Sequence, residues 1–208
     1  MIKNILLDFG GVLIDADLEA AIGAFRHLGM EDVSQYLNLY RQNDIFLGVE
    51  EGGLTKTEFN DRFREKVGRS VSDESIEKAW LAIVKEVNVE KLKWIETHRR
   101  EFRFYLLSNI NPYVFEWADT CGFSELGKPI THYFDKIFAS YQIGMTKPGD
   151  EIFEYVIDNA PLLPAETLFI DDGVRNAEAG RKFGFHVYQP QNGENWIPVA
   201  EKIIEDEK

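Results

Sequence analysis

Short apolar runs alternate with longer amphipathic segments over most of this chain. Four runs are typical of buried strands (residues 4–9, 102–108, 136–140 and 167–172), and a weaker one covers residues 185–189. Between the later runs, apolar residues recur at helical spacing over residues 111–122, 149–160 and 174–184. Strands that alternate with helices predict a parallel sheet covered on both faces, so we expect an α/β, Rossmann-like core.

Residues 16–88 follow a different pattern. Helical spacing extends over residues 18–30, 33–42, 56–68 and 74–87 without a convincing strand, and residues 42–53 are expected to be a connecting loop. Thr55 and Glu58 form a capping-box pattern, and Ser72 is a plausible N-cap. We therefore predict two domains, a core made of residues 1–15 and 89–208 and an inserted helical cap made of residues 16–88, which would act as a lid.

Polar residues stand where three of the predicted strands end. Asp8 follows the first strand and is itself followed by Gly10 and Gly11. A carboxylate at the end of a buried strand costs free energy unless it is paired, and ligands bind at the carboxyl ends of parallel strands. Asp8 is therefore either a catalytic nucleophile or a turn residue that caps a helix.

The other two polar strand ends are Ser108–Asn109 and Asp171–Asp172. Adjacent carboxylates repel each other unless a cation or a shared proton stabilises them, and Mg²⁺ prefers such oxygen ligands. Ser108 and Asn109 offer a hydroxyl and backbone N–H groups to a phosphoryl oxygen. Lys147 stands at the start of a helix, where an acidic partner or an anionic ligand would explain its positive charge.

Composition limits the possible partners. The 208 residues carry a formal net charge of −13, which argues against a general binder of nucleic acid or of anionic membranes. The apolar runs are short, and the single Cys121 fits a reducing compartment. We expect a cytoplasmic protein whose partner is a small molecule, and the sequence leaves its oligomeric state open.

Taken together, these segments resemble the haloacid dehalogenase superfamily of aspartate-nucleophile phosphatases. Residues 6–13 (LLDFGGVL), 105–109 (YLLSN), 143–153 (IGMTKPGDEIF) and 168–185 (LFIDDGVRNAEAGRKFGF) look like its four motifs in the expected order. The helical insert looks like the small cap of the first cap class. The resemblance implies a sheet with the first-motif strand at its centre and a Mg²⁺-dependent phosphatase acting on a small phosphorylated metabolite, such as a sugar phosphate.

The resemblance also implies roles for individual residues. Asp8 would be the phosphorylated nucleophile, Ser108 the phosphate anchor together with Asn109, and Lys147 the cation that neutralises the transferring group. The implied magnesium ligands are Asp8, the Gly10 carbonyl and Asp172, with Asp171 assisting directly or through water. Substrate contacts from the cap are expected among Arg41, Asp44 and Phe46.

One position departs from the family pattern. Relatives usually carry a second aspartate two residues after the nucleophile, where it protonates the leaving group and activates water, but this chain has Gly10. If nothing replaces it, a slow phosphatase that prefers good leaving groups is expected. Alternatively Asp15, Asp17 or a cap residue donates the proton, although hinge or helix-capping roles suit both aspartates better.

Two other functions remain open. A 2-haloacid dehalogenase would use the same aspartate on carbon, but that chemistry needs no metal, which the Asp171–Asp172 pair disfavours. A catalytically weakened protein that only binds a phosphorylated metabolite would explain Gly10. The joint presence of Asp8, Lys147 and the acidic pair favours an enzyme.

Overall fold

The computed structural model describes residues 1–37 and 42–207. Its main sheet has five parallel strands in the order β5-β4-β1-β6-β7. The strands are β1 (Asn4–Leu7), β4 (Arg103–Ser108), β5 (Lys136–Ala139), β6 (Thr167–Ile170) and β7 (His186–Tyr188). The expected α/β class is confirmed, and the strand of the first motif lies at the centre of the sheet.

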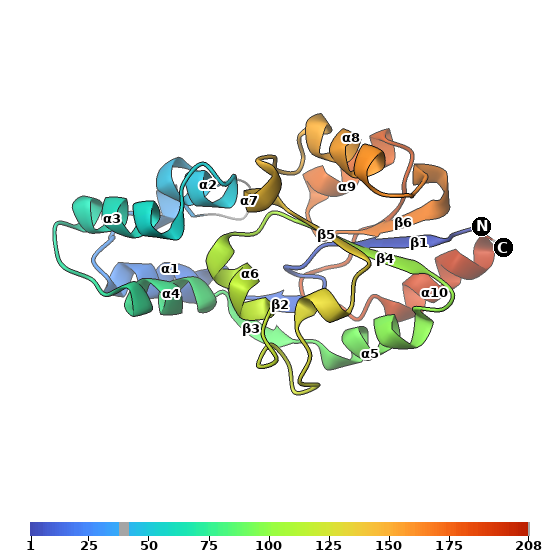
Figure 1. The fold of residues 1–208 in the computed structure, drawn as a ribbon, viewed down its shortest axis with the longest axis horizontal. Coiled ribbons are helices and arrows are strands. Elements are labelled where there is room, and N and C mark those ends of the chain that lie inside the picture. The colour runs from blue at the N-terminus through green and yellow to red at the C-terminus, as the bar shows by residue number, and fades with distance from the viewer. Residues whose placement is uncertain (38–41, 208) are drawn as a thin grey trace.

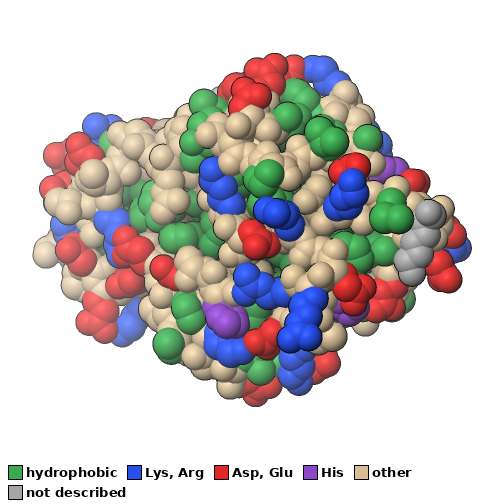
Figure 2. Space-filling model, turned by 45° about the vertical axis from the view of Figure 1, so that its right-hand side comes forward, with side chains coloured by type: hydrophobic (Ala, Val, Ile, Leu, Met, Phe, Trp, Pro, Cys, Tyr) green, Lys and Arg blue, Asp and Glu red, His purple; other side chains and the backbone are tan. Residues whose placement is uncertain are grey.

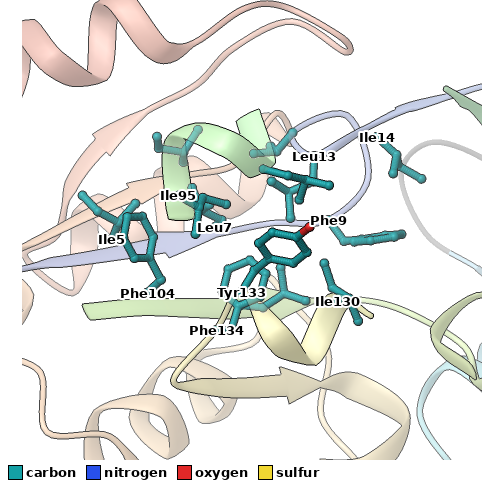
Figure 3. Packing of buried hydrophobic residues seen from close by; sticks show 14 of the residues in the cluster. Ile5, Leu7, Phe9, Leu13, Ile14, Ile95, Phe104, Ile130, Tyr133 and Phe134 are labelled. Carbon is teal, nitrogen blue, oxygen red and sulfur yellow. The ribbon is translucent and has the colours of Figure 1, made fainter. Parts of the chain in front are cut away.

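Helices cover both faces of this sheet (Figure 1). The helices α5 (Val89–His98) and α10 (Ile197–Asp206) lie on one face, and α8 (Asp150–Asn159) and α9 (Val174–Lys182) lie on the other. Side chains alternate along a strand, so each strand serves two apolar layers. Ile5 and Leu7 of β1 pack on the α5 side, where Figure 3 shows them beside Ile95 and Phe104, and Leu6 packs on the α8 side.

The carboxyl ends of all five strands meet at one edge of the sheet, because the strands are parallel. Beyond that edge lies a helical lobe, while both chain termini lie at the opposite end (Figure 1). The lobe contains α1 (Leu18–His27), a 3₁₀ turn (Val33–Gln35), α2 (Asp44–Glu50), α3 (Lys56–Val67) and α4 (Asp73–Leu81). The fold thus places the helices α1 to α4 over the ends of the strands rather than behind the sheet.

The lobe has its own aromatic core. Phe46 lies 5.0 Å from Phe25 and 5.2 Å from Trp80 between ring centroids. Tyr113 of α6 (Pro112–Ala118) reaches into this cluster from the sheet domain and donates a hydrogen bond to the buried Asn60 at 2.6 Å. The expected caps are confirmed, because α3 begins with the Thr55–Glu58 capping box and α4 begins at the N-cap Ser72.

Three local predictions for the lobe are wrong. Residues 42–53 were expected to be a loop but contain α2. Of the helix expected over residues 33–42, only the short 3₁₀ turn is seen, and residues 38–41 lie outside the described part of the chain. The helix expected over residues 74–87 ends at Leu81, and β3 (Val84–Val87) pairs antiparallel with β2 (Ile14–Ala16). Pairing with β2 is a long-range interaction, which the local helical spacing does not record.

The surface carries charges of both signs, which are interspersed on the face shown in Figure 2. Within the described residues, no helix combines the length and apolar character that crossing a bilayer requires.

The helices α5 and α10 were not predicted from the sequence pattern.

Candidate active site

Asp8 stands directly after the central strand, where the sheet meets the lobe. Its backbone N–H donates to the Ile170 carbonyl at 2.9 Å, and its Oδ1 accepts the Phe9 N–H at 2.7 Å. Burial, together with the negative charge of Asp171, raises the pKa of Asp8 to about 6 against the lowering effect of Lys147. The strand end therefore holds a buried carboxylate whose charge requires a cation nearby.

Lys147 supplies one such cation. Its Nζ lies 3.0 Å from Asp8 Oδ1 and 2.6 Å from Asp171 Oδ2, and it donates to the Leu107 carbonyl at 2.7 Å. Burial opposes the charge of Lys147, but Asp171 and Asp8 together hold its pKa above the usual value. The lysine therefore stays charged between two carboxylates, at the position where a transferring phosphoryl group would need neutralising.

Asp171 and Asp172 follow β6 and differ in their surroundings. Asp171 is fully buried and accepts hydrogen bonds from the Gly173 N–H at 2.9 Å and the Asn176 side chain at 3.0 Å, in addition to its ion pair with Lys147. Within the described part of the chain no lysine or arginine forms an ion pair with Asp172, and burial together with the charge of Asp8 raises its pKa to about 7.

These carboxylates fit a divalent cation. One oxygen each from Asp8, Asp171 and Asp172 lies within 4.8 Å of the others, and only Lys147 pairs with them among the described residues. The three carboxylates and one ammonium leave an excess of negative charge, which adds to the effect of burial in raising the pKa values of Asp8 and Asp172. Oxygen-rich donor sets of this kind suit Mg²⁺.

Gly11 makes room for this cluster. A Cβ built at Gly11 would lie 2.1 Å from Asp172 Oδ2, and the residue has a φ of +70°, which other residues adopt only with strain. Gly10 differs, because a Cβ there would meet no described atom within 4 Å. The close approach of the chain to the carboxylates therefore needs the second glycine of the pair rather than the first.

Ser108 and Asn109 end β4 beside Asp8. The Ser108 hydroxyl is buried and lowers the pKa of Asp8 by hydrogen bonding. The Asn109 side chain accepts a hydrogen bond from the Lys147 backbone N–H at 2.7 Å and donates one to the Lys147 carbonyl at 2.9 Å. These two bonds hold the backbone of Lys147 against the end of β4. One hydrogen of the Asn109 Nδ2 is left for a phosphate oxygen, because a side-chain amide carries two N–H donors, and that role stays a prediction.

A cavity of about 320 Å³ opens beside Lys147 and Asn109, between the sheet domain and the lobe. Its described lining from the lobe is Gln42, Leu47, Glu50 and Glu51, and its lining from the sheet domain includes Thr146 and Arg175. Polar groups dominate this lining. The sequence analysis did not predict that Glu50, Glu51 and Arg175 line this cavity. The adjacent acids Glu50 and Glu51, which follow an apolar segment, could have indicated a polar site there.

The cap residues expected to contact substrate are differently placed. Phe46 is fully buried in the aromatic core of the lobe and does not face the cavity, so that expectation is wrong. Asp44 begins α2 and pairs with Lys66 at 2.5 Å, away from the described cavity lining. Arg41 lies outside the described residues. The helix α2 explains the difference, because it turns Phe46 inward and brings its last residues to the cavity.

A sequence model of the haloacid dehalogenase-like hydrolases matches residues 2–184. A D-ribitol-5-phosphate phosphatase from Bacteroides thetaiotaomicron is 44% identical over 196 residues, which cover 94% of this chain and 95% of that protein.

Two solved structures are similar over nearly the whole chain. A protein from Porphyromonas gingivalis assigned to the HAD-like hydrolases superposes with a TM-score of 0.94 at 37% identity and covers 98% of each chain. A haloacid dehalogenase family enzyme from Bacteroides thetaiotaomicron, in complex with magnesium and inorganic phosphate, superposes with a TM-score of 0.87 at 36% identity over 96% of this chain and 99% of that one.

Proposed function

Since the chain belongs to the haloacid dehalogenase-like hydrolases and is a magnesium-dependent phosphatase of that family, we propose that its substrate is the phosphate monoester of a short sugar or sugar alcohol. The observation that carries the chemistry is the convergence of Asp8, Lys147 and Asp172 on one strand edge beside a polar cavity. The relative that hydrolyses D-ribitol 5-phosphate supports the substrate class.

The geometry supports one role for each residue at the strand ends. Asp8 attacks phosphorus and carries the phosphoryl group as an aspartyl phosphate, and Lys147 neutralises the charge that the phosphoryl oxygens bring to Asp8. Ser108 holds one of those oxygens. Mg²⁺ supplies further charge neutralisation when bound, and Asp8, Asp172 and the Gly10 carbonyl are its proposed ligands.

Asp171 has a supporting place in this proposal. Its two oxygens already accept hydrogen bonds from Gly173, Asn176 and Lys147. A carboxylate so occupied orients its neighbours and contacts a metal through water more readily than directly. We therefore propose that Asp171 assists the metal through water.

The cavity lining supports a hydroxylated substrate. Carboxylates, amides and a hydroxyl line most of it, and Arg175 adds a cation at the start of α9. Such groups hydrogen-bond the hydroxyls of a polyol, and a site built to do so rejects analogues that lack them.

We also propose that residues 16–88 act as a lid and that the core consists of residues 1–15 and 89–208. The separate aromatic core of the lobe and the β2–β3 ribbon at its base support this division. Closure of such a lobe would exclude water from the strand ends. Opening has to accommodate Tyr113, which joins the lobe core from the sheet domain.

A metal-independent dehalogenase is the weaker alternative, because three clustered carboxylates with one lysine call for a further cation. The proposal includes a cytoplasmic location and no nucleic-acid partner, supported by the net charge of −13 and the single cysteine.

A panel of phosphate esters tests the function. Purified protein is assayed with Mg²⁺ or with a chelator on pentitol phosphates, sugar phosphates and phosphorylated acids, and released phosphate is measured. We expect turnover of pentitol or sugar phosphates only with Mg²⁺, and at least about a 10³-fold loss in Asp8→Asn, because an amide is a poor nucleophile.

Asp17→Asn is the matched control for that variant. Asp17 caps α1 by accepting the Ala20 N–H at 2.9 Å, and asparagine caps helices equally well, so activity should be retained. Phosphatase activity that persists in Asp8→Asn, or that is unaffected by the chelator, would contradict the proposed function.

A further inference from the structure

Because Gly10 stands where relatives carry an acid, the residues at the strand ends offer no proton donor for the leaving group. Hydrolysis of an alkyl phosphate requires a proton for the departing alkoxide, and general acid catalysis typically supplies about 10²–10⁴-fold in rate. No described side chain occupies the space next to Gly10. Lys147 is held between two carboxylates and a carbonyl, so its protons are already engaged.

Glu50 lies across the cavity from these groups. It is the last residue of α2, is partly buried, and lines the same cavity as Lys147 and Asn109. It stands apart from the cluster of Asp8, Asp171 and Asp172 and is therefore available for a role other than metal binding. We infer that Glu50 is the general acid and base of this phosphatase, an inference that rests on the proposed function.

The direction of the reaction favours a group on the lobe. In phosphoryl transfer the attacking and leaving oxygens lie roughly in line on opposite sides of phosphorus. With Asp8 attacking from the strand end, the leaving oxygen points away from the sheet and toward the lobe. A proton donor for that oxygen must therefore come from the side of the lobe, where α2 ends at the cavity and where the Glu50 carboxyl is near enough to interact with the charge of Asp8.

Contacts with the sheet domain hold the end of α2 in place. The Ser140 hydroxyl donates to the Glu50 carbonyl at 2.7 Å and accepts the Ile110 N–H at 2.9 Å, and Ser140 is fully buried. A Cβ at Gly52 would lie 2.0 Å from the Tyr141 carbonyl, so the chain passes directly against α7 (Ser140–Ile143). The backbone of Glu50 is thereby fixed to the sheet domain although the residue belongs to the lobe.

The electrostatic surroundings keep the Glu50 carboxyl protonated near neutral pH. Burial raises its pKa to about 8, and the negative charges of Glu51 and Asp8 add to this against the opposing effect of Lys147. Arg175 and Glu151 are the other charged residues lining the cavity. A general acid must hold its proton when substrate binds, and a pKa of about 8 suits that requirement at neutral pH.

The proton balance closes over two steps. In the first, the Asp8 oxygen–phosphorus bond forms, the bond from phosphorus to the leaving oxygen breaks, and the Glu50 proton passes to that oxygen. In the second, a water oxygen bonds to phosphorus, the Asp8 oxygen–phosphorus bond breaks, and Glu50 takes one proton from the water. Glu50 ends as it began, with inorganic phosphate as the product.

Asp15 and Asp17, the two aspartates that follow Gly10 in the sequence, make other contacts. Asp17 is the N-cap of α1. Asp15 lies against Gly193, where an added Cβ would stand 2.8 Å from its carboxylate. Burial lowers the pKa of Lys91, and the negative charge of Asp15 opposes this lowering. Neither lines the described cavity.

The test compares two esters in Glu50→Gln. The phosphorylation step is measured by single-turnover kinetics with Mg²⁺ on a pentitol phosphate, whose alkoxide needs a proton, and on 4-nitrophenyl phosphate, whose phenolate does not. We expect the variant to phosphorylate about 10²-fold or more slowly with the alkyl ester and to stay within about threefold of wild type with the aryl ester. The aryl ester also shows that the variant is folded.

Two further variants sharpen the comparison. Glu51→Gln makes the same change in the neighbouring carboxylate, which would contact substrate hydroxyls. It should weaken binding of the pentitol phosphate without the loss of about 10²-fold in its phosphorylation rate at saturating substrate. Glu50→Gln combined with Gly10→Asp places an acid at the family position, where space is open, and should restore alkyl-ester phosphorylation by about tenfold or more. A Glu50→Gln rate that falls equally for both esters, or for neither, overturns the inference. A wild-type protein without phosphatase activity on either ester overturns instead the proposed function beneath it.

Discussion

Replacement of Gly11 by alanine is the most direct test of how the chain approaches the carboxylate cluster. The new Cβ would lie 2.1 Å from Asp172 Oδ2 and 2.4 Å from its Cγ, whereas real Cβ contacts essentially never fall below 3.0 Å. Asp172 would therefore have to retreat by about 0.9 Å, nearly half of a Mg–O bond of about 2.1 Å. The backbone adds a second cost, because alanine at a φ of +70° is strained by about 1–2 kcal/mol.

The expected result follows from these two effects. We predict a loss of about 1–3 kcal/mol in the free energy of unfolding, which for a chain of this size lowers Tm by about 2–12 °C. We also predict at least about a tenfold weaker apparent affinity for Mg²⁺, since displaced ligands of this kind typically lose about 10–100-fold. Denaturant unfolding in a chelator measures the first quantity, and Mg²⁺ titration of activity measures the second.

Gly10→Ala is the matched control, because the same methyl group added one residue earlier meets no described atom within 4 Å. Its stability should change by no more than about 0.5 kcal/mol, and its Mg²⁺ dependence should be that of the wild type. Equal behaviour of the two alanine variants would refute the assignment of Gly11 as the residue that admits Asp172.

Two further predictions concern the buried charges. Lys147→Met should destabilise the protein by about 3–5 kcal/mol in denaturant unfolding, because Asp8 and Asp171 lose their shared cation. The exposed pair Lys182–Asp150 gives the control Lys182→Met, expected to cost under about 1 kcal/mol, and similar losses in both would contradict the prediction. Asp172→Asn should stabilise the metal-free protein progressively from pH 4 to 7, since the Asp172 pKa of about 7 lies above its unfolded value and the wild type loses stability over that interval. Unfolding in a chelator at pH 5 and 7.5 measures this gain, which should reverse with excess Mg²⁺, and a pH-independent difference would refute it.

The chemistry of the strand ends could be predicted from the sequence because its signals are local. Asp8 and Asp171–Asp172 end apolar runs, and parallel strands necessarily bring their carboxyl ends to one edge. The N-caps Thr55 and Ser72 could also be predicted from the sequence, since an N-cap satisfies backbone groups within its own turn. The catalytic roles of Asp8, Ser108 and Lys147 stay predictions, of which Asp8→Asn tests the first.

Tertiary structure decided what depends on contacts between distant segments. Phe46 and Glu50 lie four residues apart in one apolar stretch, yet the fold buries the first in the lobe and brings the second to the cavity. The spacing of apolar residues within this segment cannot predict which of the two is buried, because the end of α2 is held by a hydrogen bond from Ser140, ninety residues further along the chain. Gly10 and Gly11 also show that local sequence cannot assign a role that depends on a distant residue. Both are visible in the sequence, but only the position of Asp172, fixed by β6 beside β1, separates the glycine that must lack a side chain from the one that has room for one.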